Sequence, residues 1–124
     1  MKTRSYNSRM MEALESRSMM SAVAYGDFNN DGLVDMAVLT NPTTITVSLA
    51  KPDGSYVVSA ILTAPKSLPI TGVQVDDYNH DGKLDISAGG LASNRFYEHT
   101  WLGNGDGTFG ARDTWRGSRI RDGW

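Results

Sequence analysis

One nine-residue pattern occurs twice in this chain, at a spacing of fifty residues. The two copies are DFNNDGLVD at residues 27–35 and DYNHDGKLD at residues 77–85. Both read DxNxDGxxD, with oxygen-bearing side chains on alternate residues, a glycine at the sixth position and a closing aspartate. A fixed period of this length is typical of repeat proteins, in which each repeat folds as one supersecondary unit. The sequence therefore predicts two similar units with one such loop in each.

The composition of the pattern indicates a calcium-binding loop. Calcium takes about six to eight oxygen ligands at loose geometry, and magnesium fits less well because it demands a tight octahedron. Alternate side chains can converge on one ion if glycine lets the backbone turn around it. We therefore predict two Ca²⁺ sites, each formed by four side chains and one backbone carbonyl. The predicted ligands are Asp27, Asn29, Asp31, the carbonyl of Leu33 and Asp35 in the first loop, and Asp77, Asn79, Asp81, the carbonyl of Lys83 and Asp85 in the second.

The pattern also permits two alternative interpretations. The first is a helix-loop-helix calcium hand, which needs an acidic ligand at its twelfth position, where this chain has Val38 and Ala88. The segments after the loops, MAVLT and ISAGG, are short, partly β-branched and followed or broken by turn residues, which favours strands. The second interpretation is that clusters of Asp, Asn and Gly are ordinary turns of a β protein.

The repeat extends beyond the loops. SLAKPDGSY at residues 48–56 matches WLGNGDGTF at residues 101–109 at an offset of fifty-three, so the second unit has three extra residues. We expect this insertion in a surface loop within residues 91–99. Asp53-Gly54 and Asp106-Gly107 predict hairpin turns before the last strand of each unit. Each unit thus reads as four strands.

The combination of VxxGDFNxDGxxD at residues 23–35 with LGNGDGTF at residues 102–109 resembles the FG-GAP or VCBS-type repeat, over roughly residues 21–112. The resemblance implies an all-β fold of two four-stranded antiparallel blades of an integrin-α-like β-propeller. It also implies a calcium-binding, non-catalytic module of bacterial secreted or cell-surface proteins, with protein or carbohydrate ligands and a role in adhesion. The chain departs from the pattern where Gly26 is matched by Asp76, which either adds a ligand or faces solvent.

The resemblance divides the chain into four segments. Residues 1–20 are expected to form an export-linked leader or a short helix that caps the first blade. Residues 21–69 and 70–112 are the two blades, and residues 113–124 are a basic tail or the start of a further blade. Propellers usually have about four to eight blades. The chain is therefore expected to be part of a larger propeller or to associate with copies of itself.

Composition gives few further indications of function. The net charge of −2 predicts no general attraction to nucleic acid or membrane, and no apolar run is long enough for a membrane span. His80 and His99 are expected in loops without a nucleophile to activate, so we predict no enzymatic activity. Tyr97 and Trp101 are candidates for stacking on a sugar, or else packing residues. The alternative function is a fragment or accessory domain of a polysaccharide lyase or hydrolase.

Overall fold

The computed structural model describes residues 22–92 and 95–119, and these residues form β-strands and no helix. The predicted leader or capping helix at residues 1–20 lies outside the described residues. The strands are β1 (Val23–Gly26), β2 (Asp35–Asn41), β3 (Thr44–Ala50), β4 (Tyr56–Thr63), β5 (Gly72–Asp76), β6 (Asp85–Ala92), β7 (Arg95–Trp101) and β8 (Asp113–Arg119). The all-β prediction is confirmed.

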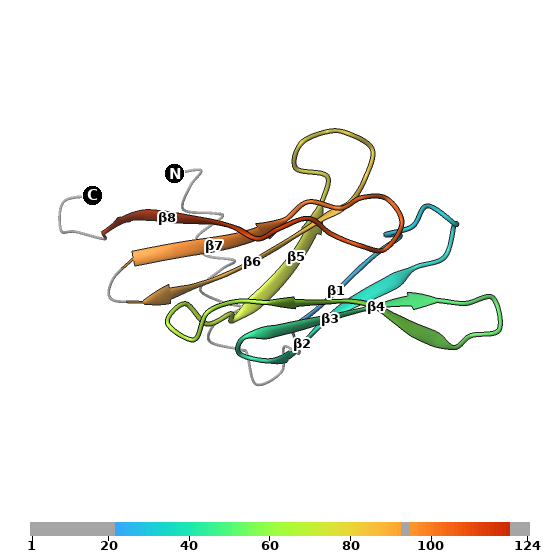
Figure 1. Ribbon diagram of the computed structural model, residues 1–124, viewed down its shortest axis with the longest axis horizontal. Coiled ribbons are helices and arrows are strands. Elements are labelled where there is room, and N and C mark those ends of the chain that lie inside the picture. The colour runs from blue at the N-terminus through green and yellow to red at the C-terminus, as the bar shows by residue number, and fades with distance from the viewer. Residues whose placement is uncertain (1–21, 93–94, 120–124) are drawn as a thin grey trace, which may run out of the picture.

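The strands form two antiparallel four-stranded sheets with the same topology (Figure 1). The first sheet has the order β1-β2-β3-β4 and the second has the order β5-β6-β7-β8, so every strand pairs with its neighbour in sequence. The register places Gly26 opposite Asp35 in the first sheet and Asp76 opposite Asp85 in the second. Both nine-residue patterns therefore occupy the same connection, between the first and second strands of their sheets.

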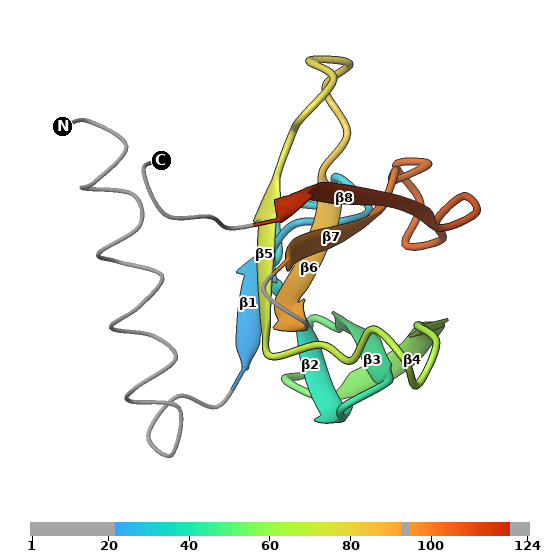
Figure 2. The same ribbon diagram turned by 90° about the vertical axis from the view of Figure 1, so that its left-hand side faces the viewer.

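One core lies between the sheets. β1 and β5 run side by side, and the sheets spread apart from this line (Figure 2). Alternate residues of the central strands point into the core, and Phe28 meets Phe109 edge to face with ring centroids 5.6 Å apart. The buried cluster consists of Phe28, Ala37, Ile45, Val47, Leu62, Ala64, Ile70, Ile86, Ala88 and Trp101.

The difference between Gly26 and Asp76 is explained by this contact between sheets. A Cβ atom on residue 26 would lie 2.7 Å from Leu84 Cδ1 and 3.0 Å from Val75 Cγ1, so a larger residue there would require these side chains of the second sheet to move. Asp76 is exposed, and its Oδ1 accepts a hydrogen bond from the N–H of Asp77 at 2.7 Å. Of the two possibilities left open by the sequence, the solvent-facing position is the one observed.

The expectation of a surface loop within residues 91–99 is wrong. Leu91 and Ala92 end β6, and β7 begins at Arg95. Ile86 pairs with Trp101 where the first sheet pairs Met36 with Ser48, so the three extra residues lengthen both arms of a hairpin. His99 is consequently a fully buried strand residue, not a loop residue.

The segment expected as a tail or a further blade also has a different role over residues 113–119. These residues form β8, which pairs with β7 and completes the second sheet. After the Asp106-Gly107 turn there is only a single bridge, between Gly103 and Phe109, and regular pairing resumes at Asp113. In the first sheet the fourth strand begins at Tyr56, which is equivalent to Phe109, but in the second sheet it begins only at Asp113. The sequence comparison therefore placed the end of the second unit too early, at residue 112.

The linker between the sheets, residues 64–71, is fixed by side chains of β7. His99 Nε2 lies 2.9 Å from the carbonyl oxygen of Leu68, and Tyr97 Oη donates to the carbonyl of Pro69 at 2.5 Å. His99 Nδ1 lies 2.8 Å from Thr114 Oγ1. Because a carbonyl can only accept, Nε2 carries the proton and the neutral ring accepts from the Thr114 hydroxyl. Burial lowers the pKa of His99, the Leu68 hydrogen bond opposes this shift, and the Arg112 cation adds to it.

We predict that Phe28→Ala lowers the free energy of unfolding by about 3–5 kcal/mol, because it removes a buried ring from the contact between the sheets. Tyr78 holds the equivalent position in the second loop but is 39% exposed, so Tyr78→Ala should cost clearly less. Urea unfolding followed by circular dichroism measures both. Equal losses for the two variants would contradict the proposed packing role of Phe28.

We also predict an acid-sensitive contribution from His99. Its folded pKa lies below the ordinary value of 6.5, so the stability it contributes is present above pH 6.5 and is lost as the pH falls through the folded pKa. His99→Gln should remove this slope from stability measured between about pH 7 and about pH 5, where carboxylates stay ionised. The exposed His80 provides the control, because His80→Gln should leave the slope intact. A wild-type stability that does not fall over this interval would contradict the prediction.

Candidate metal centre

The two loops share an unusual backbone course. Gly32 and Gly82 have φ values of 86° and 84°, in the left-handed region that the sequence predicted for the sixth position. Asn30 and His80, at the fourth position, are also left-handed, with φ values of 58° and 57°. This second left-handed residue was not predicted from the sequence. Asparagine tolerates this conformation and was a signal for it in the first loop, whereas histidine gave a weaker one.

The first aspartate of each loop is held by backbone N–H groups of the same loop. Asp27 Oδ1 accepts from the N–H of Asp31 at 3.1 Å, and Oδ2 accepts from the N–H of Gly32 at 2.8 Å. Asp77 makes the same bonds to Asp81 and Gly82 at 3.1 and 2.8 Å. Partial burial raises the pKa of Asp27, but these hydrogen bonds lower it more, and the net pKa is below its ordinary value. The carboxylate is therefore ionised at neutral pH.

The closing aspartate of each loop is fully buried and joins three segments. Asp35 Oδ2 accepts from the N–H of Phe28 at 2.9 Å, and its Oδ1 accepts from the N–H of Ala50 at 2.8 Å. In the second loop Asp85 accepts from Tyr78 at 2.9 Å and from Gly103 at 2.8 Å. Each carboxylate thus connects its own strand to the start of the loop and to the end of the third strand. The sequence predicted a ligand here but not this structural role.

The predicted side chains converge in both loops. Asp27, Asp31 and Asp35 each offer an oxygen within 4.8 Å of the others, and Asn29 Oδ1 is buried beside them without a hydrogen-bond partner. In the second loop the amide oxygen of Asn79 faces only acceptors. The distances from this amide position are 3.1 Å to Asp77 Oδ1, 3.1 Å to Asp81 Oδ1 and 3.2 Å to Asp85 Oδ2. If the amide were rotated by half a turn, its nitrogen would occupy the position and donate to all three carboxylates.

This donor set fits a hard cation. Ligand oxygens at about 2.3–2.6 Å from a calcium ion lie about 3 Å from one another, which matches the spacing around Asn79. The unpartnered oxygen of Asn29 likewise needs a donor or a cation. Leu33 and Lys83 donate their N–H groups to Asp31 Oδ1 and Asp81 Oδ1, each at 2.9 Å. The ligand role of their carbonyl groups stays a prediction.

The two candidate residues for sugar stacking lie in the interior. Tyr97 and Trp101 are each 3% exposed and alternate with His99 on the face of β7 that points toward the first sheet. Trp101 belongs to the core between the sheets, and its ring centroid is 6.0 Å from that of His99. The structure therefore places both rings in packing, the alternative that the sequence had left open, because the supposed loop is a strand.

We predict that Asp35→Ala destabilises the protein even in the presence of a calcium chelator. The change leaves the N–H groups of Phe28 and Ala50 without their acceptor, at a cost of about 1–3 kcal/mol for each buried donor. Asp31 is exposed and its carboxylate accepts only local, exposed hydrogen bonds, from the N–H of Leu33 and the side-chain amide of Asn29, so Asp31→Ala in chelator should cost much less. Chemical unfolding in chelator measures both. Equal small losses would show that the buried carboxylate is not a structural connection.

Comparison with known proteins agrees with the geometry. In the part of the chain that the structure describes, no helix has the length and apolar character needed to cross a membrane. No curated protein and no solved structure is significantly similar to this chain. The family model of the FG-GAP-like repeat matches residues 27–88, which is half of the chain and contains both loops. The chain belongs to the FG-GAP-like repeat family.

Proposed function

We propose that this chain is a calcium-stabilised, non-catalytic binding module of a bacterial secreted or cell-surface protein, built from two β-propeller blades. The observation that carries the proposal is the cluster of Asp27, Asp31 and Asp35 in the first loop, together with the three carboxylates around the Asn79 amide in the second. Each loop is the connection between the first and second strands of its sheet. FG-GAP-like repeat membership supports the same function. The ligand would be a protein or a carbohydrate.

The proposed role of calcium is to offset repulsion among the carboxylates of each loop. Asp27 and Asp31 approach the buried Asp35 closely, and like charges at such distances repel. A bound divalent cation would supply the missing positive charge. Because Asp35 also holds the N–H of Ala50 at the end of β3, fixing this carboxylate fixes the loop relative to three strands.

The outward face of the first sheet supports the assignment to propeller blades. Tyr25, Met36 and Ser48 form one row across this face, and Tyr25 is 63% exposed. The equivalent row of the second sheet is Val75, Ile86 and Trp101, which packs against the first sheet. By this equivalence, the outward face is a packing face that a further sheet would cover. That sheet would come from a larger propeller or from another copy of the chain.

The non-catalytic assignment is supported by the histidines. His80 is exposed in the second loop, and His99 is buried with both ring nitrogens engaged. The burial of His99 prevents it from reaching a substrate as a general base. The loop carboxylates are also unsuited to acid-base work, because a bound cation would hold them ionised.

We predict that calcium raises the stability of the protein at both loops. At millimolar free calcium and a dissociation constant on the order of 10–100 μM, each site would add about 1.4–2.7 kcal/mol. Thermal unfolding in calcium, in magnesium and in chelator measures the effect, with metal content determined on the purified protein. Asp31→Ala and Asp81→Ala should each remove about half of the calcium-dependent gain. The proposal is wrong if calcium and chelator give the same melting temperature.

A further inference from the structure

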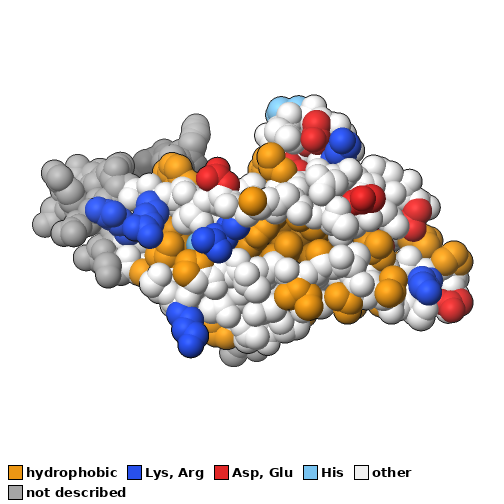
Figure 3. Space-filling model, viewed as in Figure 1, with side chains coloured by type: hydrophobic (Ala, Val, Ile, Leu, Met, Phe, Trp, Pro, Cys, Tyr) orange, Lys and Arg blue, Asp and Glu red, His pale blue; other side chains and the backbone are white. Residues whose placement is uncertain are grey.

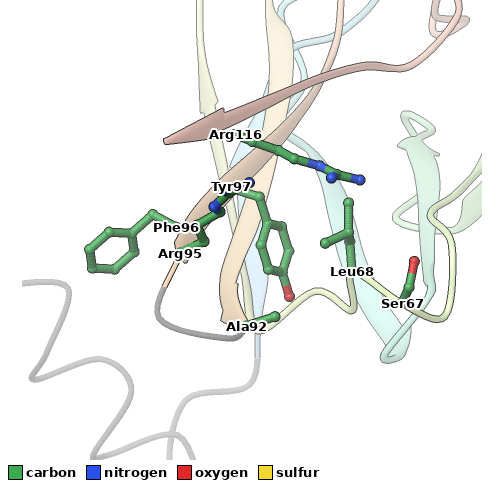
Figure 4. Close-up of a pocket in the computed structure, with 7 residues that line it drawn as sticks. All are labelled: Ser67, Leu68, Ala92, Arg95, Phe96, Tyr97 and Arg116. Atoms are coloured by element: carbon green, nitrogen blue, oxygen red, sulfur yellow. The ribbon is translucent and has the colours of Figure 1, made fainter. Parts of the chain in front are cut away.

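A hollow of about 360 Å³ lies where the linker meets the second sheet. We call it the seam pocket. In Figure 4, Tyr97 and Leu68 face each other across it, and Arg116 extends from β8 above them. Its lining combines an apolar wall with two exposed arginines and one serine. The lining residues are Ser67, Leu68, Ala92, Arg95, Phe96, Tyr97 and Arg116.

The positive charge of the pocket has no counter-charge. None of its lining residues is acidic, and within the described residues no ion pair engages Arg95 or Arg116. The acids of the neighbouring strand segments are Glu98 and Asp113. They alternate in register with Tyr97 and His99 and therefore point to the opposite face of the sheet.

Two further cations extend this charge along the seam. Arg112 crosses between the sheets, donating from Nη1 to the carbonyl of Thr63 at 3.2 Å, and Lys66 is an exposed residue of the linker. Figure 3 shows Lys and Arg side chains gathered on this half of the molecule, with most acidic side chains on the other half. The net charge of the chain is −2, so this basic region is a local separation of charge.

The floor of the pocket is rigid before any ligand binds. The linker carbonyls of Leu68 and Pro69 are held by His99 and Tyr97. Gly90 allows this approach, because a Cβ atom there would lie 2.7 Å from Tyr97 Oη and 2.9 Å from the carbonyl oxygen of Pro69. The buried Tyr97 thus positions the wall, while the exposed arginines are free to bind. A preorganised site of this kind loses less entropy on binding.

We propose that the seam pocket binds an acidic carbohydrate. A sugar ring would lie against the half-buried apolar lining residues, such as Leu68 and Ala92, and not against the buried Tyr97. Its carboxylate or sulfate group would accept hydrogen bonds from Arg95 and Arg116. Planar guanidinium groups match such oxyanions in geometry. Arg112 and Lys66 continue the positive charge beyond the pocket, which suits a chain with repeated charges better than a single carboxylate. This inference rests on the proposed function as a binding module and names the site and ligand class.

The test measures binding to immobilised oligogalacturonate, with dextran sulfate as the sulfate source, neutral dextran as the uncharged control and polyglutamate as the acidic peptide. The proteins are the wild type, the Arg95→Gln/Arg116→Gln double variant, and Lys51→Gln as the matched control. Lys51 is an exposed cation in the β3–β4 hairpin, away from the pocket. We expect the double variant to lose about tenfold or more in affinity for an acidic glycan, and Lys51→Gln to lose little.

Each outcome separates the possibilities. Stronger binding to oligogalacturonate or to dextran sulfate identifies the oxyanion, and either one supports the proposal. The proposal is overturned if the double variant and the Lys51 variant lose the same affinity, or if the wild type binds no acidic glycan. It is also overturned if the protein binds neutral dextran equally well or polyglutamate more strongly. Thermal unfolding with and without calcium is recorded on the same samples. A calcium effect without glycan binding would refute only the pocket, whereas glycan binding without a calcium effect would refute only the calcium sites.

Discussion

The structure depends on a buried carboxylate that closes each loop. Asp35 and Asp85 are fully buried, and each accepts hydrogen bonds from two backbone N–H groups that are distant in sequence from one another. A buried charge is costly unless hydrogen bonds or a counter-ion compensate it. The two N–H groups give part of that compensation, and a cation in the loop would give the rest. The same residue would therefore link the geometry of the sheet to the binding of a cation.

The two units are similar in sequence, but only one of them faces a second sheet through its loop. Phe28 and Gly26 are enclosed by residues of the following unit, whereas Tyr78 and Asp76, at the equivalent positions, are exposed. Contact with a following sheet thus accounts for both differences. No further sheet covers the second loop among the described residues, so Tyr78 and Asp76 can be larger and more polar than Phe28 and Gly26. The repeat is a shared scaffold whose details depend on what covers it.

The sequence predicted the local backbone structure well and the longer-range packing less well. The left-handed glycines, the two hairpin turns and the four strands of each unit follow from residue types over short distances, and the structure contains them. The insertion was misplaced because the extra residues around His99 extend a hairpin, and pairing across strands cannot be deduced from residue types alone. The structural role of Asp35 was missed for a related reason, since its partner Ala50 is fifteen residues away. The residues that line the seam pocket come from the linker and from separate strands, so no sequence motif indicates it.

The second DxNxDGxxD loop and the seam pocket lie at opposite ends of the second sheet. Asp85 begins β6 at the loop, and Ala92 ends it at the pocket, a distance of about 23 Å along an extended strand. At physiological ionic strength this distance is more than twice the screening length, so charge at the loop has little direct effect on the arginines. The pocket floor is held by hydrogen bonds from β7 to the linker, none of which involves a loop residue. Within the described strands the two sites are joined through the packed sheet, so calcium would act on the pocket through the stability of the whole fold.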